Sequence, residues 1–190
     1  MTLRWIASEE MAVIYKDRML VDFPESELKP LERIIETMEQ GLCRVLTMIE
    51  GEELLAYAVF IFPKGGKHIL LDYFAVNKEL RGRGSGHKFF ELLAPYMHEN
   101  LPEIEGVFIE SERVEPDLTD REIRERRIAF YLDCGCTMTD LESRLFGVTF
   151  SILFFGLKGD REVGYDDLDY IYRAMFKEKH YHTQVQIWKK

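Results

Sequence analysis

Apolar residues recur at helical spacing through the first forty positions of the chain. Met11, Ile14, Tyr15 and Met19 lie three or four positions apart after Ser8, and a second apolar stripe over residues 28–38 follows Pro24. This spacing is typical of amphipathic helices; Ser8 suits a helix start, and Gly41 suits a helix end. After a short apolar start at residues 3–6, we therefore predict two helices, the first capped by Ser8 and the second beginning after Pro24.

Three runs rich in β-branched and other apolar residues follow. They span residues 42–49, 54–62 and 68–76, and turn-forming residues separate them at 50–53 and 63–67. Strands joined by such short connections pair in the antiparallel sense. We predict three neighbouring antiparallel strands.

The pattern then changes to that of a parallel unit. The third strand leads into the glycine-rich loop RGRGSG, residues 81–86, which is followed by helical spacing from Phe89 to Met97 and by a strand-like run at 107–111. A strand, a helix and a second strand in this order form a right-handed parallel crossover. The chain is therefore expected to form an α/β fold with a mixed sheet.

The last third predicts one more helix, then strands around an insert. Residues 119–122, Thr-Asp-Arg-Glu, fit a capping box, and the helix that it opens should end at Gly135. A long apolar run at 145–155 and a closing strand at 183–188 flank an insert, residues 158–179, with Leu168, Ile171, Tyr172 and Met175 at helical spacing. The insert either shapes a substrate pocket or covers a sheet edge or a partner in a homodimer.

Composition narrows the class of protein. The 190 residues, 46% of them hydrophobic, suit one domain spanning residues 1–190. A formal net charge of −9 argues against nucleic acid and anionic membranes as partners, and it favours cationic partners such as amines. Three cysteines, no signal-peptide pattern and no apolar run long enough to cross a bilayer predict a cytoplasmic protein.

The loop at residues 81–86 has the chemistry of an anion site. Gly82, Gly84 and Gly86 let the backbone N–H groups approach a pyrophosphate at the start of a helix, where the helix dipole favours negative charge. Arg81, Arg83 and Lys88 add positive charge. The spacing matches neither G-x-G-x-x-G nor G-x-x-x-x-G-K-[ST]. The alternative interpretation is a solvated basic turn.

Two motifs carry a resemblance to a known family. The pattern Arg81-x-x-Gly84-x-Gly86, after a strand ending in Phe-Ala-Val, resembles the acyl-CoA loop of the GNAT superfamily of N-acetyltransferases. The segment 129–136 resembles the family's A-x-Y-x-x-x-G-F motif, with Tyr131 at the tyrosine position and Cys136 in place of the usual aromatic residue. The order of the predicted elements agrees with the family over nearly the whole chain.

The resemblance implies a fold and a cofactor. The fold is a mixed six- to seven-stranded sheet with antiparallel N-terminal strands, a central parallel pair splayed around the cofactor, and helices on both faces. The cosubstrate is acetyl-CoA. Its pyrophosphate would lie on the loop, and its pantetheine arm on the backbone of the preceding strand; these cofactor-binding residues are Phe74, Ala75, Val76, Arg81, Gly82, Arg83, Gly84, Ser85 and Gly86.

The implied reaction is attack of a primary amine on the thioester, in a small molecule or peptide that the sequence does not identify. Tyr131 would donate a hydrogen bond or a proton to the departing thiolate. An amine with a pKa near 10.4 must shed a proton, which costs about 4 to 5 kcal/mol at pH 7. Glu110 is our candidate base. Glu112 lies on the same face of its strand, and Asp72 lies in the strand before the loop, so all three could border the acceptor; a water could serve instead. A non-catalytic acyl-CoA sensor of the same fold is the alternative function.

A metal site is not expected. Cys134-x-Cys136 and His180-x-His182 carry ligand types, but neither spacing matches the two-residue gap of structural zinc sites. Packed cysteines and a polar strand start account for both pairs.

Overall fold

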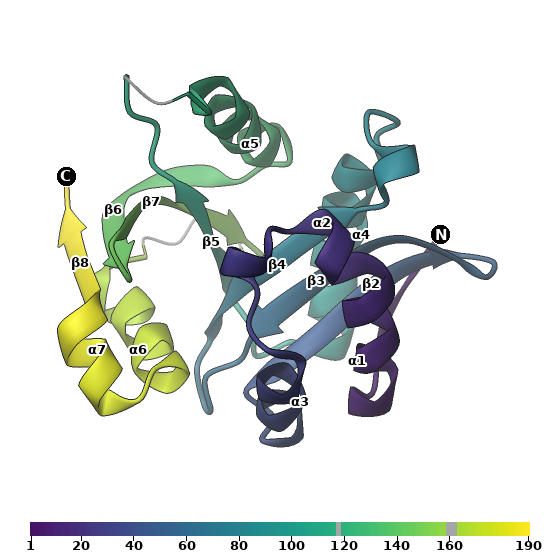
Figure 1. The fold of residues 1–190 in the computed structure, drawn as a ribbon, viewed down its shortest axis with the longest axis horizontal. Helices are drawn as coiled ribbons and strands as arrows, with labels where there is room; N and C mark the ends of the chain where they lie inside the picture. Colours follow the sequence, from purple (N-terminus) through teal and green to yellow (C-terminus); the bar gives the residue numbers. More distant parts are fainter. Residues whose placement is uncertain (117–118, 159–162) are drawn as a thin grey trace.

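The computed structural model describes residues 1–116, 119–158 and 163–190. Its core is an eight-stranded sheet in the order β1-β2-β3-β4-β5-β7-β6-β8, and the described residues contain one parallel pair, β4 with β5. Figure 1 shows the sheet twisting through the molecule with the first and last strands at its two edges. The expected α/β fold with a mixed sheet is confirmed, but the sheet has eight strands rather than six or seven.

The N-terminal helices differ in detail from the prediction. An edge strand, β1 (Thr2–Trp5), precedes α1 (Ser8–Ile14), which continues through a π-helical turn (Tyr15–Met19) into α2 (Leu20–Asp22). Ala7 rather than Ser8 is the N-cap of α1, because the Glu10 carboxylate accepts a hydrogen bond from Ala7 N at 3.1 Å.

The second long helix starts later than predicted. A 3₁₀ turn (Glu25–Glu27) follows Pro24, and α3 (Leu31–Glu39) begins only after Pro30. Leu28 and Pro30 have ψ values of 131° and 143°, which are not helical, and a proline pushes the residue before it, here Lys29, toward extended backbone. The side chain of Lys29 instead reaches Asp72 on β4.

The central elements agree with the predicted pattern. Three antiparallel strands, β2 (Cys43–Glu50), β3 (Glu53–Ile61) and β4 (His68–Val76), are followed by a 3₁₀ turn (Lys78–Leu80), by α4 (Ser85–Asn100) and by the parallel strand β5 (Gly106–Glu112). The crossover from β4 to β5 therefore passes through the glycine loop and α4.

The C-terminal third contains a strand that was not predicted. Helix α5 (Arg121–Asp133) leads to the hairpin of β6 (Thr137–Leu145) and β7 (Val148–Gly156). The apolar run at 145–155 is thus one strand and a turn, because Phe146 and Gly147 both have positive φ, 49° and 89°, as a two-residue hairpin turn requires.

Two further predictions in this region are wrong. Thr119 does not cap α5; Asp120 is the N-cap residue, and its carboxylate accepts from Arg124 Nε at 2.9 Å instead of from the helix backbone. The closing strand begins later than 183, because α7 (Glu178–Gln184) precedes β8 (Val185–Lys189). The insert's helical spacing is confirmed as α6 (Tyr165–Met175); the part at 159–162 lies outside the described residues.

Apolar side chains cover the sheet on both faces. One cluster packs the N-terminal helices and α6 against one face, with Met11, Ile34 and Tyr172 fully buried. The other packs α4 and α5 against the opposite face, with Phe89, Phe90 and Leu93 fully buried or nearly so. Helices on both faces are therefore confirmed, and Figure 1 shows α4 behind the sheet and α1 and α3 in front of it. Within the described ranges, no helix is both long and apolar enough to cross a membrane.

Candidate functional site

The central parallel strands pair for only part of their length. Their register runs from His68↔Gly106 to Leu71↔Ile109 and then stops, although β5 continues beside β7 as far as Glu112. The register of β4 with β3 shifts between Val59 and Phe60, which leaves Asp72 as an extra, bulged residue. A β-bulge bends its strand, so the bulge at Asp72 turns β4 away from β5. The expected splay is present, and Asp72 and Glu110 are the first residues beyond it.

Beyond the bulge, β4 has a partner strand on one side only. Residues Tyr73 to Val76 pair with β3, and β5 has already diverged on the other side. An unpaired strand edge presents N–H and C=O groups that an extended ligand can join. Phe74, Ala75 and Val76, the residues predicted to lie along a pantetheine arm, are part of this edge.

The glycine loop ends in the N-terminus of α4, as predicted. Gly82 and Gly84 have φ values of 74° and 82°, and a Cβ added at either would meet no protein atom within 4 Å. The first backbone bond of α4 runs from Lys88 N to Gly84 O at 2.9 Å. The N–H groups of the three residues before Lys88, Ser85 to His87, therefore have no acceptor within the helix. Together with the helix dipole they form an anion-binding geometry.

Gly86 has a different role from the other loop glycines. It is buried in the first turn of α4, and a Cβ added there would lie 2.9 Å from two ring atoms of Phe130 on α5. The absence of a side chain lets these two helices approach closely. Gly86 thus sets the position of the helix that carries Tyr131.

Arg81 is held by protein groups. Its Nε donates to Val76 O at 3.1 Å, and its Nη2 lies 2.8 Å from Asp22 Oδ1 at the end of α2. The Asp22 side chain is only 1% exposed and also accepts from Arg18 and from the Tyr57 hydroxyl, both at 3.2 Å. The guanidinium of Arg81 therefore anchors the loop in this structure, while Arg83 is exposed.

Glu110 lies in a network with groups from the C-terminal part of the chain. The hydroxyl of Tyr172, on α6, donates to the Glu110 carboxylate, and Ser143 Oγ on β6 lies 2.9 Å from the same hydroxyl. The pKa of Glu110 is raised to about 7, chiefly by burial; the Tyr172 hydrogen bond opposes this rise, the negative charge of Asp72 adds to it, and the Lys29 charge opposes it. Such a carboxylate exchanges a proton readily near neutral pH.

The other two candidate carboxylates have different surroundings. Asp72 accepts from Lys29 Nζ at 2.5 Å and influences the pKa of Glu110 across the split, the place beyond Leu71 and Ile109 where β4 and β5 no longer pair. Glu112 instead pairs with Arg124 and Arg127 of α5, at 3.3 and 3.5 Å. Glu112 is therefore paired with α5, whereas Asp72 and Glu110 are neighbours where β4 and β5 part.

Tyr131 lies on the opposite face of the sheet from Glu110. It is 8% exposed and packs against Phe90 and Phe130, with ring centroids 5.9 and 5.2 Å apart. Burial raises the pKa of its hydroxyl, so the phenol remains protonated at neutral pH. Tyr131 belongs to the α4–α5 cluster and the Glu110 partner Tyr172 to the other. The two predicted catalytic residues are thus on opposite faces of the sheet.

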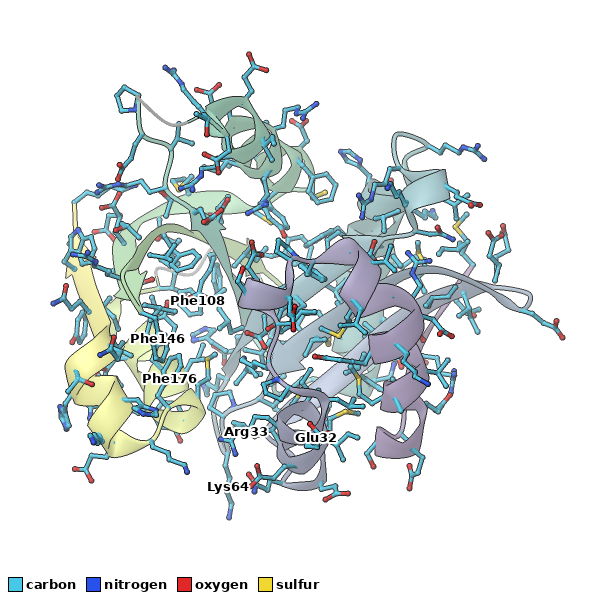
Figure 2. The ribbon with its side chains drawn as sticks, in the orientation of Figure 1. Glu32, Arg33, Lys64, Phe108, Phe146 and Phe176 are labelled. Carbon is cyan, nitrogen blue, oxygen red and sulfur yellow. The ribbon has the colours of Figure 1, made fainter. Side chains whose placement is uncertain are left out.

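A small cavity adjoins Asp72 on the face that α3 and α6 cover. Its volume is about 40 Å³, and its lining includes Lys29, Arg33, Asp72 and Met175. Figure 2 shows Arg33 on the side of α3 turned toward α6. The cavity has room for about one water molecule. A larger cavity of about 330 Å³, near Trp5, Met38 and Arg44, has no carboxylate or histidine in its lining.

The possible metal ligands do not come together. Cys134 and Cys136 lie at the end of α5, whereas His180 and His182 lie on α7. Burial raises the pKa of both thiols to about 12, so neither is a ready thiolate ligand. Throughout the described part of the chain, no group of three or more His, Cys, Asp or Glu residues could hold a metal ion.

Some residues of the site had no signal in the sequence. Asp22, Lys29 and Ser143 carry no motif, and they are near the site only because the chain folds back on itself. Tyr172 was predicted as one apolar position of a helix; nothing in that spacing indicated that its hydroxyl meets Glu110.

The sequence matches the model of the Acetyltransferase (GNAT) family over residues 8–135. A search of the curated proteins found no match.

Solved structures of similar fold span most of the chain. A GNAT-family protein from Bacteroides thetaiotaomicron has a TM-score of 0.66 at 17% identity, covering 85% of this chain and 89% of that one. An aminoglycoside 6'-N-acetyltransferase in complex with coenzyme A has a TM-score of 0.59 at 11% identity, covering 85% and 100%. Mutant forms of the spermidine/spermine N-acetyltransferase from Vibrio cholerae have a TM-score of 0.58 at 11% identity, covering 82% and 94%. At these identities the likeness concerns the fold alone.

Proposed function

This chain belongs to the GNAT family of acetyltransferases, and on this premise we propose that it transfers the acetyl group of acetyl-CoA to a primary amine by direct attack in a ternary complex. One observation carries the proposal: β4 and β5 part at Asp72 and Glu110, and the strand that turns away leads directly into an anion-binding helix N-terminus. A coenzyme can therefore be bound at its pyrophosphate and along its arm by one continuous stretch of backbone.

The pyrophosphate binds at the N-terminus of α4. The N–H groups at Ser85, Gly86 and His87 point out of the helix, and the space before Gly82 and Gly84 holds no protein side chain. Arg83 adds an exposed positive charge, and Arg81 keeps the loop attached to α2. The arm then pairs with the open edge at Phe74, Ala75 and Val76, which brings the thioester to the split.

The amine reaches the thioester from the face where Glu110 lies. Glu110, with a pKa of about 7, takes the proton that the ammonium loses. The neutral amine nitrogen attacks the thioester carbonyl, the C–N bond forms, and the C–S bond of the tetrahedral intermediate breaks. The thiolate leaves toward the opposite face, where the protonated hydroxyl of Tyr131 stabilises it by a hydrogen bond. The proton that the new amide nitrogen then loses neutralises the thiolate, so the products are the acetylated amine and the free thiol of coenzyme A.

The similar structures suggest acceptors to try. One acts on aminoglycosides and another on spermidine and spermine, so both classes belong in a panel of amines that also includes short peptides. The protein is incubated with acetyl-CoA and each amine while thiol release is followed. We expect release with at least one amine, and we expect acetyl-CoA alone to raise the melting temperature.

Two variants separate binding from chemistry. Gly84→Val places a β-branched residue at a φ of 82°, which is strained, and its side chain enters the space of the pyrophosphate; the rise in melting temperature should be lost. Tyr131→Phe should keep that rise and lower kcat. Stabilisation by acetyl-CoA without thiol release for any amine would favour the sensor, and no stabilisation would contradict both functions.

A further inference from the structure

The ammonium group of Lys29 sits in a small cation site at the split. Its Nζ lies 2.5 Å from Asp72 Oδ2 and 5.7 Å from the centroid of the Tyr73 ring. The Asp72 side chain is 12% exposed and that of Lys29 is 36% exposed. A carboxylate and an aromatic ring are the two groups that proteins use most directly to hold an ammonium ion.

The backbone around Lys29 is fixed, so the ion pair is not a mobile surface contact. Lys29 N donates to the Tyr73 hydroxyl at 3.1 Å, and that hydroxyl donates to Glu27 O at 2.8 Å. Lys29 O accepts from the Tyr15 hydroxyl at 3.2 Å. Pro30 has a fixed φ and also restricts the backbone of Lys29, the residue before it. The segment therefore holds the side chain of Lys29 over Asp72.

The site lies where the acceptor amine must arrive. Asp72 is the bulged residue from which β4 turns away from β5, and Glu110 is its neighbour across the split. The charge of Asp72 raises the pKa of Glu110, and the charge of Lys29 lowers it, so the three groups influence one another. A cation bound to Asp72 is thus next to the candidate base.

A second cation near the site, Arg33, already has an anionic partner. Arg33 lines the same cavity, but its Nη1 lies 2.6 Å from the Glu36 carboxylate. Without Lys29, Asp72 would be a largely buried carboxylate beside a second carboxylate, Glu110, and it would favour a replacement cation strongly.

We propose that Asp72 and the ring of Tyr73 form the binding site for the acceptor's ammonium group, and that Lys29 of the same chain fills this site until an acceptor displaces it. This inference rests on the proposed function for the identity of the ligand as the acceptor. It names the acceptor as an amine that is cationic when it binds, and it makes Lys29 an internal competitor.

The competition has a measurable size. A ligand's apparent affinity falls by the fraction of time that its site is free, so a lysine that fills the site for about nine-tenths of the time weakens an external amine about tenfold. Removal of the charge of the lysine side chain should therefore make the external amine bind about tenfold more tightly. The gain should depend on Asp72.

The test is a titration with n-butylammonium in which NMR measures binding. It uses four proteins: wild type, Lys29→Met, Lys29→Met with Asp72→Asn, and the control Lys67→Met. Lys67 pairs with Glu105, away from the split. We expect about tenfold tighter binding in Lys29→Met, a return to wild-type affinity or weaker in the double variant, and no change in the control. Butanol, which has no charge, should bind equally weakly to all four.

The outcomes separate this inference from the proposed function. Equal affinity of wild type and Lys29→Met, or a gain that persists without Asp72, would overturn the ammonium site whether or not acetyl transfer occurs. Tight, Asp72-dependent binding without thiol release from acetyl-CoA would support the site and contradict the transferase. If both hold, Lys29→Met should lower the KM for the amine and leave the KM for acetyl-CoA unchanged.

Discussion

At the scale of single residues, the chemistry of Glu110 is set by its neighbours. Burial and the charge of Asp72 favour its protonated form, whereas the Tyr172 hydroxyl and Lys29 favour the carboxylate. The balance leaves its pKa at about 7, well above the ordinary value near 4.5. A base must be deprotonated to accept a proton, so activity should rise as the pH rises through this value.

The pH profile of kcat/KM tests this role. We expect the wild-type value to rise with pH up to a plateau above a midpoint of about 7. Glu110→Gln should lower activity at least about 100-fold, the usual contribution of a positioned base. The rise of kcat/KM around pH 7 should also disappear in this variant.

Tyr172→Phe tests the pKa of Glu110 without removing its carboxylate. Since the tyrosine hydrogen bond lowers the pKa of Glu110, its loss should move the midpoint to higher pH without abolishing activity. A profile that keeps its midpoint in both variants would show that another group is the base.

At the scale of elements, the contact between α4 and α5 connects the glycine loop to Tyr131. Gly86 begins one helix and faces the ring of Phe130 on the other, and Tyr131 is the next residue. Phe130 also stacks with Phe74 on β4, with ring centroids 6.0 Å apart. The ring of Phe130, on the same helix as Tyr131, therefore contacts both α4 and β4.

Gly86→Ala tests how tightly this contact is fitted. An alanine inside a helix normally stabilises by up to about 1 kcal/mol relative to glycine. Here the new Cβ would lie 2.9 Å from the Phe130 ring, so we expect the free energy of unfolding to fall by about 1 to 2 kcal/mol.

Urea denaturation measures this change. In Gly86→Ala with Phe130→Leu, the smaller side chain removes the clash, and the cost of the alanine should shrink. Increased stability of the single variant would mean that α5 moves away freely and that the helices are not closely fitted.

At the scale of the whole molecule, Asp22 connects three regions that are distant in the sequence. Its buried carboxylate accepts from Arg18 in the N-terminal helices, Tyr57 on β3 and Arg81 in the glycine loop. The N-terminal segment therefore helps to hold the loop in place, although it supplies no residue to the predicted coenzyme site.

Asp22→Asn should weaken folding and coenzyme binding together. The change leaves two guanidinium groups without their shared carboxylate, and we expect a loss of about 1 to 3 kcal/mol in the free energy of unfolding. Acetyl-CoA affinity should fall because the loop loses its anchor. The exposed residue Asp17 offers a matched control, Asp17→Asn, which should change neither quantity.

A double-mutant cycle assigns the effect to the pair. If Asp22 acts on the coenzyme through Arg81, Asp22→Asn should have little further effect on acetyl-CoA affinity in an Arg81→Met background. Additive losses would show that the two residues act separately.

Local patterns in the sequence determined much of the fold. The glycine loop, the strand before it and the helix after it depend on neighbouring residues, and the structure has all three where they were predicted. Gly135, with a φ of 89°, likewise follows the end of α5 as expected. These features follow from backbone freedom at glycine and from apolar periodicity, which act over a few residues.

Only the tertiary structure decided the other features. Strand β6 was missed because its largely polar sequence owes its conformation to the strands on its two sides, β7 and β8. The split at Asp72 depends on a bulge in the pairing of two strands, and the surroundings of Glu110 depend on Lys29 and Tyr172, 81 and 62 positions away. A residue's pKa and its partners depend on which segments pack together. The sequence by itself thus predicted the family and the position of the glycine loop, whereas the packing of distant segments decided the surroundings of Glu110.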